Sequence, residues 1–196
     1  TGNWNATSTW NPAGIPTNGD NVTIPNANRT VTIPAGYSAA CDSITFIGGN
    51  RTTSINLAAA TSSLTVGAAS GTGNVTINVP TQNGITKQIN VGAGTFWAKS
   101  LTLTGTTANP TRITLLAIST GTATITGNIT SAGSASQIVF SGSGTLNVGG
   151  SFLSGAQGTF TASTGTVNFN GAGDQTISPF AYTFYNVTLS GSGVKT

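Results

Sequence analysis

The stretch "LNVGGSFLSGAQGTFTASTGTVNFNG", from Leu146 to Gly171, sets the architecture of this chain. It contains three short strand-like runs, and glycine-rich corners separate them. An alternating strand turns one row of side chains inward and the other outward. Here the inward row would be Leu, Val and Phe, and the outward row mainly Thr, Ser and Asn. Three such strands in about 21 residues are what one turn of a three-sided parallel β-solenoid needs.

The strand-then-glycine pattern recurs along the chain. Five copies start at intervals of about 20–23 residues, and a nearly fixed period of this kind marks a repeat architecture. The five are "LTLTG" from Leu101, "ATITG" from Ala123, "LNVGG" from Leu146, "VNFNG" from Val167 and "VTLSG" from Val187, and a similar pair starts at Ile44 and Leu64. We therefore predict an all-β chain that forms one right-handed parallel β-solenoid, with about eight or nine coils of about 20–23 residues. A Greek-key sandwich also has many short strands, but it does not call for a nearly constant period.

The two ends of the chain differ from the repeats. Residues 1–40 are expected to form an N-terminal cap and the first coil or coils, and residues 41–196 the solenoid, irregular between about 67 and 100. Trp4 and Trp10, with prolines around them, suit a cap, and with Asp20 they mark a cap or assembly end. Sugar binding by an exposed tryptophan is the alternative.

At the C-terminus another coil begins and no cap is visible, so we expect an open end that further chain or another subunit covers. A start at Thr1 without Met suggests a processed form.

The composition argues against several classes of partner. Only 5% of the residues are charged, against about a quarter in ordinary globular proteins, and no apolar run approaches the roughly 18 residues of a membrane span. The net charge is +3, and the six basic residues are scattered. A nucleic-acid footprint needs a basic patch. We therefore expect no membrane span and no nucleic-acid partner.

Catalytic chemistry has few candidates in this sequence. The acids are Asp20, Asp42 and Asp174, and the chain has neither His nor Glu. Glycoside hydrolysis normally takes two carboxylates on either side of the bond, and the single Cys41 has no histidine to activate it. The loop from Gly171 to Asp174 looks like a phosphate cradle, but strand-like residues follow it where a cradle needs a helix. We predict no enzyme activity, no cofactor and no metal site, and we interpret this loop as a solenoid corner.

Two further sequence features bear on function. Acceptor sequons for N-glycosylation occur at Asn5, Asn21, Asn28, Asn50, Asn74, Asn128 and Asn186, and some could carry sugars in a secreted protein. Threonines at alternate positions, such as Thr122-x-Thr124-x-Thr126, could form an ice-binding array. In the following coils the matching positions hold Asn147 and Asn168, so that row is mixed.

Both ends of the chain resemble known bacterial proteins. The opening resembles the start of many large secreted bacterial β-helix proteins, and residues from about 101 to 196 resemble a repeat in surface proteins of gliding, type-IX-secreting bacteria. The residues that carry the resemblance are Gly2-x-Trp4, Trp10, Gly14-x-Pro16, Gly19-Asp20-x-Val22-x-Ile24, "ACDSITF" from Ala40, "GTVNFNGAGDQTI" from Gly165 and "FYNVTLSGSGVKT" from Phe184. The resemblance implies an extracellular, adhesin-like or matrix-like role.

Together these patterns predict a non-enzymatic structural protein, extracellular or at the cell surface. It would be a rod-like module, either the subunit of a surface filament or the stalk of an adhesin. Its partners would be copies of itself, joined head to tail, or further repeats of the same polypeptide, and possible additional partners are surface glycans. A carbohydrate- or ice-binding solenoid module is the alternative function.

Overall fold

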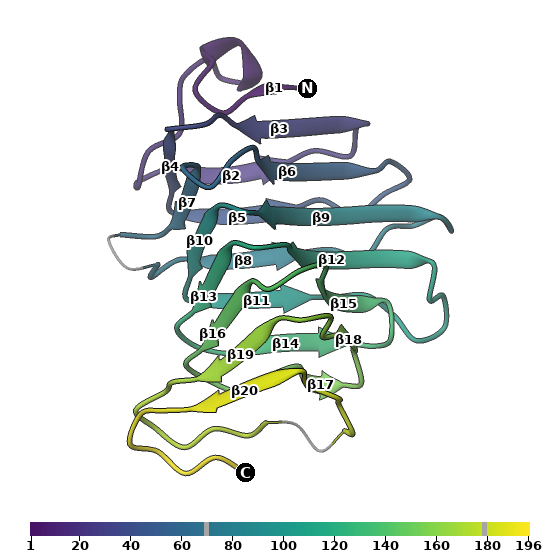
Figure 1. Cartoon of the computed structure of the whole chain (residues 1–196). Coiled ribbons are helices and arrows are strands. Elements are labelled where there is room, and N and C mark those ends of the chain that lie inside the picture. Colours follow the sequence, from purple (N-terminus) through teal and green to yellow (C-terminus); the bar gives the residue numbers. More distant parts are fainter. Residues whose placement is uncertain (69–70, 178–179) are drawn as a thin grey trace.

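The structure is a computed structural model and describes residues 1–68, 71–177 and 180–196. The chain winds into a β-solenoid whose strands form three parallel sheets, as the sequence predicts (Figure 1). We name these sheets A, B and C. From β2 to β19 the strands follow one another along the chain in the order B, A, C, so three consecutive strands make one turn.

The strands of each sheet are short and stack in chain order. Sheet A holds β1 (Gly2–Asn3), β3 (Arg29–Ile33), β6 (Thr53–Leu57), β9 (Ile85–Gly92), β12 (Arg112–Ile118), β15 (Ser136–Phe140) and β18 (Thr159–Thr161). Sheet B holds β2 (Asn21–Ile24), β5 (Ser43–Phe46), β8 (Asn74–Ile77), β11 (Ser100–Leu103), β14 (Ile129–Ala132) and β17 (Ser154–Ala156). Sheet C holds β4 (Ser38–Cys41), β7 (Ser63–Val66), β10 (Thr95–Ala98), β13 (Thr122–Ile125), β16 (Thr145–Val148), β19 (Thr166–Phe169) and β20 (Asn186–Leu189). A single 3-10 turn, η1 (Thr7–Thr9), follows β1 in the described part of the chain.

The solenoid has about seven turns, fewer than the eight or nine predicted, because sheets A and C hold seven strands each and sheet B holds six. The length of a turn varies along the chain. The step from Thr145 to its partner Thr166 matches the predicted period, but the step from Ile55 to its partner Ile89 is more than half as long again. The predicted period therefore holds in the C-terminal turns and at the first step of sheet B, from Asn21 to Ser43, but not in the turns between them. Residues 67–100, irregular in sequence, still carry strands of all three sheets. The right-handed winding stays a prediction.

Side chains at alternate positions fill one continuous core, in register from turn to turn. One inward row of sheet C is fully buried and runs through Leu64, Phe96, Ala123, Leu146 and Val167. The large Phe96 pairs with the small Ala123, and two residues along the strand Ala98 pairs with Ile125. At these two positions a large side chain lies against a small one, and such pairs fit together in the narrow interior.

The corners between sheets C and B require glycine because the backbones of successive turns touch there. A β-carbon on Gly149 would lie 2.2 Å from the Thr126 carbonyl oxygen, and one on Gly171 would lie 2.1 Å from the Gly149 carbonyl oxygen. The loop from Gly171 to Asp174 is therefore a corner, as predicted. Asp174 has a local role in it, because its Oδ1 accepts a hydrogen bond of 2.9 Å from the Val194 N–H of the next turn.

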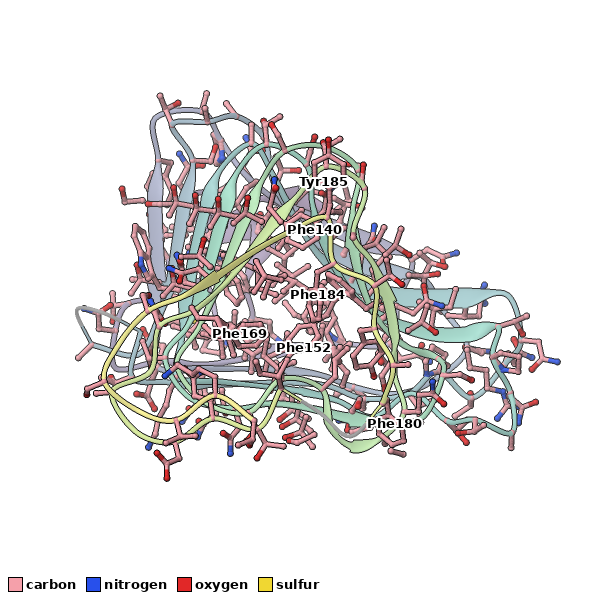
Figure 2. The ribbon with its side chains drawn as sticks, turned by 60° about the horizontal axis from the view of Figure 1, so that its bottom comes forward. Phe140, Phe152, Phe169, Phe180, Phe184 and Tyr185 are labelled. Atoms are coloured by element: carbon pink, nitrogen blue, oxygen red, sulfur yellow. The ribbon has the colours of Figure 1, made fainter. Side chains whose placement is uncertain are left out.

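The last turns hold an aromatic cluster that the sequence did not reveal. The Phe152 ring lies in edge-on contact with Phe160, Phe169 and Tyr182, at centroid distances of 5.3 to 5.8 Å. Figure 2 shows Phe152, Phe169 and Phe184 inside the ring of sheets. The final strand β20 is different, because its inward residues Val187 and Leu189 remain 46% and 58% exposed.

How much an inward leucine contributes to stability depends on whether a further turn stacks over it. Leu146 and Leu189 both point inward from sheet C, but Leu146 is fully buried and Leu189 is exposed. We expect Leu146→Ala to lower the free energy of unfolding by about 2–5 kcal/mol, because it leaves a cavity. The matched variant Leu189→Ala should lower it by less than about 1 kcal/mol. Urea denaturation followed by circular dichroism measures both, and equal losses would contradict this account of the core.

Candidate functional site

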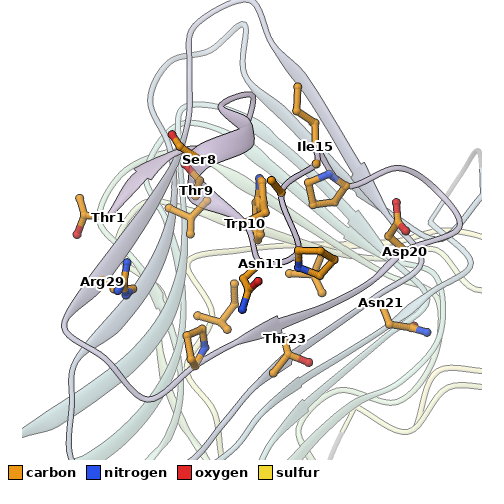
Figure 3. Close-up of a pocket in the computed structure, with 18 residues that line it drawn as sticks. Thr1, Ser8, Thr9, Trp10, Asn11, Ile15, Asp20, Asn21, Thr23 and Arg29 are labelled. Atoms are coloured by element: carbon orange, nitrogen blue, oxygen red, sulfur yellow. The ribbon is translucent and has the colours of Figure 1, made fainter.

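A pocket lies at the N-terminal end of the solenoid, between residues 8–16 and strand β2 (Figure 3). Its volume is about 810 Å³. All four residues of β2 line it, and the facing wall includes the apolar Trp10, Pro12, Ile15 and Pro16 beside the polar Ser8, Thr9 and Asn11. The pocket therefore combines a partly apolar wall with the edge of a β-strand.

The two predicted tryptophans differ in their access to this pocket. Trp4 is fully buried in the core, and its backbone N–H donates a hydrogen bond of 2.7 Å to the Thr32 carbonyl oxygen of sheet A. Trp10 is half-buried and packs edge-on against Trp4 with a centroid distance of 4.8 Å. Its Nε1 donates to the Trp4 carbonyl oxygen over 2.8 Å. This packing suits a cap and leaves Trp10, but not Trp4, within reach of a ligand.

The charged side chains that line the pocket are Asp20 and Arg29, and they lie on opposite sides of it (Figure 3). Asp20 is exposed at the entry to β2, and its Oδ2 accepts hydrogen bonds of 2.8 Å from both the backbone N–H and the hydroxyl of Thr17. These bonds lower the pKa of the Asp20 carboxyl. Arg29 opens strand β3 on the neighbouring sheet. The pocket thus carries a negative pole and a positive pole.

Two of the three acids, Asp20 and Asp42, lie near the Cys41 thiol in successive turns of the solenoid, and the third lies far from them. Asp42 follows Asp20 by one turn, and its backbone N–H donates to the Asp20 carbonyl oxygen over 2.8 Å, but Asp42 does not line the pocket. Asp174 lies at the other end of the stack. Cys41 is fully buried, and burial, with Asp42 and Asp20 nearby, raises the pKa of its thiol to about 12. Within residues 1–68, 71–177 and 180–196, no three metal-ligating side chains of the His, Cys, Asp or Glu type come together.

The seven predicted sequon asparagines are all exposed. Their pattern has a structural reason in sheet B, where β2 and β8 place Asn21 and Thr23, and Asn74 and Thr76, at successive outward positions. A neutral strand with Asn and Thr on its outer face produces the Asn-x-Thr sequence without any selection for glycans. Glycosylation of these sites stays a prediction.

A buried lysine is the main polar feature that the sequence-based predictions missed. Lys87 is fully buried in β9, where it pairs with Thr53 of the turn before and Thr114 of the turn after. Its Nζ donates hydrogen bonds of 3.3 Å to Thr53 Oγ1 and 3.4 Å to Asn26 Oδ1. Burial lowers the pKa of Lys87, because no carboxylate compensates for the lost hydration.

The sequence did carry a signal for both basic residues. Lys87-x-Ile89-x-Val91 and Arg29-x-Val31-x-Ile33 place each cation in phase with the inward apolar row of its strand. Because Lys87 stands at an inward position of this alternation, the sequence alone would have assigned it to the core. It would also have assigned Arg29 to the inner side of sheet A, at the end where the pocket lies.

In comparisons with known proteins, no family model, no curated protein and no solved structure matches this chain. The resemblance to secreted β-helix surface proteins therefore stays a prediction. In the described part of the chain, no helix is long and apolar enough to cross a membrane.

The buried lysine makes stability depend on pH. The unfolded chain, with a lysine pKa of about 10.4, binds more protons than the folded chain at any pH between the lowered folded pKa and that value. Protonation thus opposes folding, and the penalty disappears as the pH rises toward about 10.4. We expect Lys87→Met to be more stable than the wild-type protein at pH 7, with a difference that shrinks by pH 10. Urea denaturation at pH 7 to 10 measures this difference. A difference that stays constant over this range would contradict the assignment.

Proposed function

We propose that this chain is a non-enzymatic, extracellular structural module. It would act as a rod at the bacterial cell surface, either as the subunit of a filament or as the stalk of an adhesin. One observation carries this proposal: three hydrogen-bonded sheets run along the whole stack and end in an uncovered turn. The neutral outer faces, with few charges in the whole sequence, suit a scaffold better than a catalyst.

The mechanism is mechanical. A pull along the rod is resisted by the ladders of all three sheets together, and a parallel ladder distributes the load over several hydrogen bonds in each turn. The seven turns share one continuous core, so no hinge interrupts them in the described part of the chain. Such a module holds whatever it is attached to at a fixed distance.

The ends of the rod supply the contacts for assembly. Four of the exposed large apolar side chains gather on and around the last strand: Tyr185, Val187, Leu189 and Val194. In every preceding turn of sheet C the matching inward residues are covered by the next strand. A second copy, or a further repeat of the same polypeptide, would cover them in the same way. A head-to-tail contact of this kind is heterologous and generates open filaments.

Self-association tests the filament version directly. We expect the mass from light scattering to rise with protein concentration, and negative-stain electron microscopy to show rods longer than one copy. The variant Val187→Lys with Leu189→Lys should remain monomeric because it charges the uncovered row. The variant Asn186→Lys with Thr188→Lys changes the outer face of the same strand and should still associate. If the wild-type protein stays monomeric at the highest concentration, head-to-tail assembly is excluded and the adhesin-stalk function remains.

Ice binding is a second candidate, because sheet B displays a regular row of threonines. Thr23, Thr45, Thr76, Thr102 and Thr130 pair in register over five successive strands. Strand spacing repeats these hydroxyls about every 4.8 Å. Beside them Ser100 Oγ donates to Asn74 Oδ1 over 2.7 Å, and Ser43 Oγ donates to Asn21 Oδ1. A rigid, neutral face of this kind can order water into a lattice. The mixed row noted in the sequence lies on sheet C, where Thr124 pairs with Asn147.

Thermal hysteresis measures ice binding. If sheet B binds ice, the wild-type protein will depress the freezing point below the melting point, and Thr76→Lys with Thr102→Lys will abolish most of the effect. The control is Thr122→Lys with Thr145→Lys, which changes an equally regular pair on sheet C. No hysteresis in the wild-type protein, or equal loss in both variants, would exclude this function for sheet B.

A further inference from the structure

Strand β2 has one paired edge and one unpaired edge. It is the end strand of sheet B and pairs with β5 alone in the described chain. The carbonyl oxygens of Asp20 and Ile24 accept hydrogen bonds of 2.8 and 3.0 Å from the backbone of the next turn. The backbone groups of alternate residues in a parallel strand point to opposite edges. The N–H and C=O groups of Val22 therefore also point toward β5, whereas those of Asn21 and Thr23 point to the unpaired edge.

The pocket lies along this unpaired edge. All four β2 residues line it, and the facing wall of Trp10, Pro12, Ile15 and Pro16 makes no hydrogen bond to the backbone of β2. The same turn of sheet A is completed by β1, which pairs with β3. In sheet B the described chain supplies no strand at this position, and a pocket of about 810 Å³ lies there.

The chemistry of the pocket selects one class of ligand. Its floor offers two N–H donors and two C=O acceptors that alternate along a line, and this pattern is complementary to an extended peptide backbone. A sugar ring offers hydroxyls around a disc and does not repeat along such a line. The apolar wall suits the alternate side chains of a strand, and the poles Asp20 and Arg29 lie at opposite sides of the pocket (Figure 3).

We propose that this pocket binds an extended peptide segment of another protein by strand addition to β2. The segment lies parallel to β2, as every strand of sheet B does, and about four residues of it, spanning roughly 13 Å, match the length of β2. Because Asp20 precedes β2 in the chain, the segment carries a basic residue at its N-terminal end. It carries an acidic residue at the end near Arg29. This inference does not rest on the structural role proposed above.

Two synthetic peptides of identical composition test the proposal. The first is the acetylated and amidated hexapeptide KTVTVD, and the second is DTVTVK, which reverses the two poles. We expect KTVTVD to change the tryptophan fluorescence through Trp10 in a saturable way, and to bind at least tenfold more tightly than DTVTVK. Amide exchange measured by NMR should slow at Asn21 and Thr23 when KTVTVD binds.

Variants of the full chain separate strand addition from other binding. Thr23→Pro removes an N–H from the unpaired edge, which an edge strand tolerates, and should weaken KTVTVD at least tenfold. Val187→Pro removes an N–H from the unpaired edge of β20 and should leave binding unchanged. Asp20→Asn should remove the preference between the two peptides, whereas Asp174→Asn should preserve it. Circular dichroism confirms that each variant is folded.

The proposal is overturned by any of four results. These are no saturable binding of KTVTVD at millimolar concentration, equal affinity for both peptides in the wild-type protein, unchanged binding after Thr23→Pro, and unchanged exchange at Asn21 and Thr23. Displacement of KTVTVD by a neutral oligosaccharide at lower concentration than the peptide would assign the pocket to sugars instead.

Discussion

Each turn of this solenoid is stable only when its neighbours satisfy its backbone and cover its inward side chains. A single turn is too small to enclose a core of its own. In-register parallel pairing solves this by placing Leu146 between Ala123 and Val167, with buried apolar side chains on both sides. The same pairing brings backbones into contact at the corners, where Gly149 and Gly171 leave no room for a β-carbon. Core, corners and outer rows are therefore all consequences of register.

Register also explains the polar groups inside the solenoid. At two corners a buried polar side chain lies against carbonyl oxygens of the turn before and satisfies them. Ser136 Oγ donates to the Leu103 and Gly105 carbonyl oxygens, and Gln175 Nε2 donates to those of Val148 and Gly150. Lys87 occupies the same kind of position with two long bonds to neutral oxygens. Since a desolvated cation needs stronger partners than these, Lys87 is a weak point in an otherwise satisfied row.

A stack that is regular along its length concentrates its distinctive chemistry at the ends and on the faces. At the N-terminal end, the edge of β2 borders a pocket with Trp10, Asp20 and Arg29 around it. At the other end, β20 leaves Val187 and Leu189 uncovered. Unpaired strand edges invite further strands. Both of the interactions proposed for the ends, assembly and peptide binding, use this property, whereas the threonine row uses the regularity of a face.

Local alternation was enough to predict the period-two strands, the three-sided turn, the glycine corners and the neutral outer surface, because each of these depends on only a few neighbouring residues. The sequence also located Trp4, Trp10 and Asp20 near one end. The number of turns could not be read in this way, because corner lengths in the N-terminal half do not follow the period of the C-terminal half. For the same reason the row from Thr23 to Thr130 stayed hidden, since its members are unevenly spaced along the chain. Which residues of different turns become neighbours emerged only in the folded chain. That pairing depends on the path of every corner, and local alternation carries no information about the length of a corner.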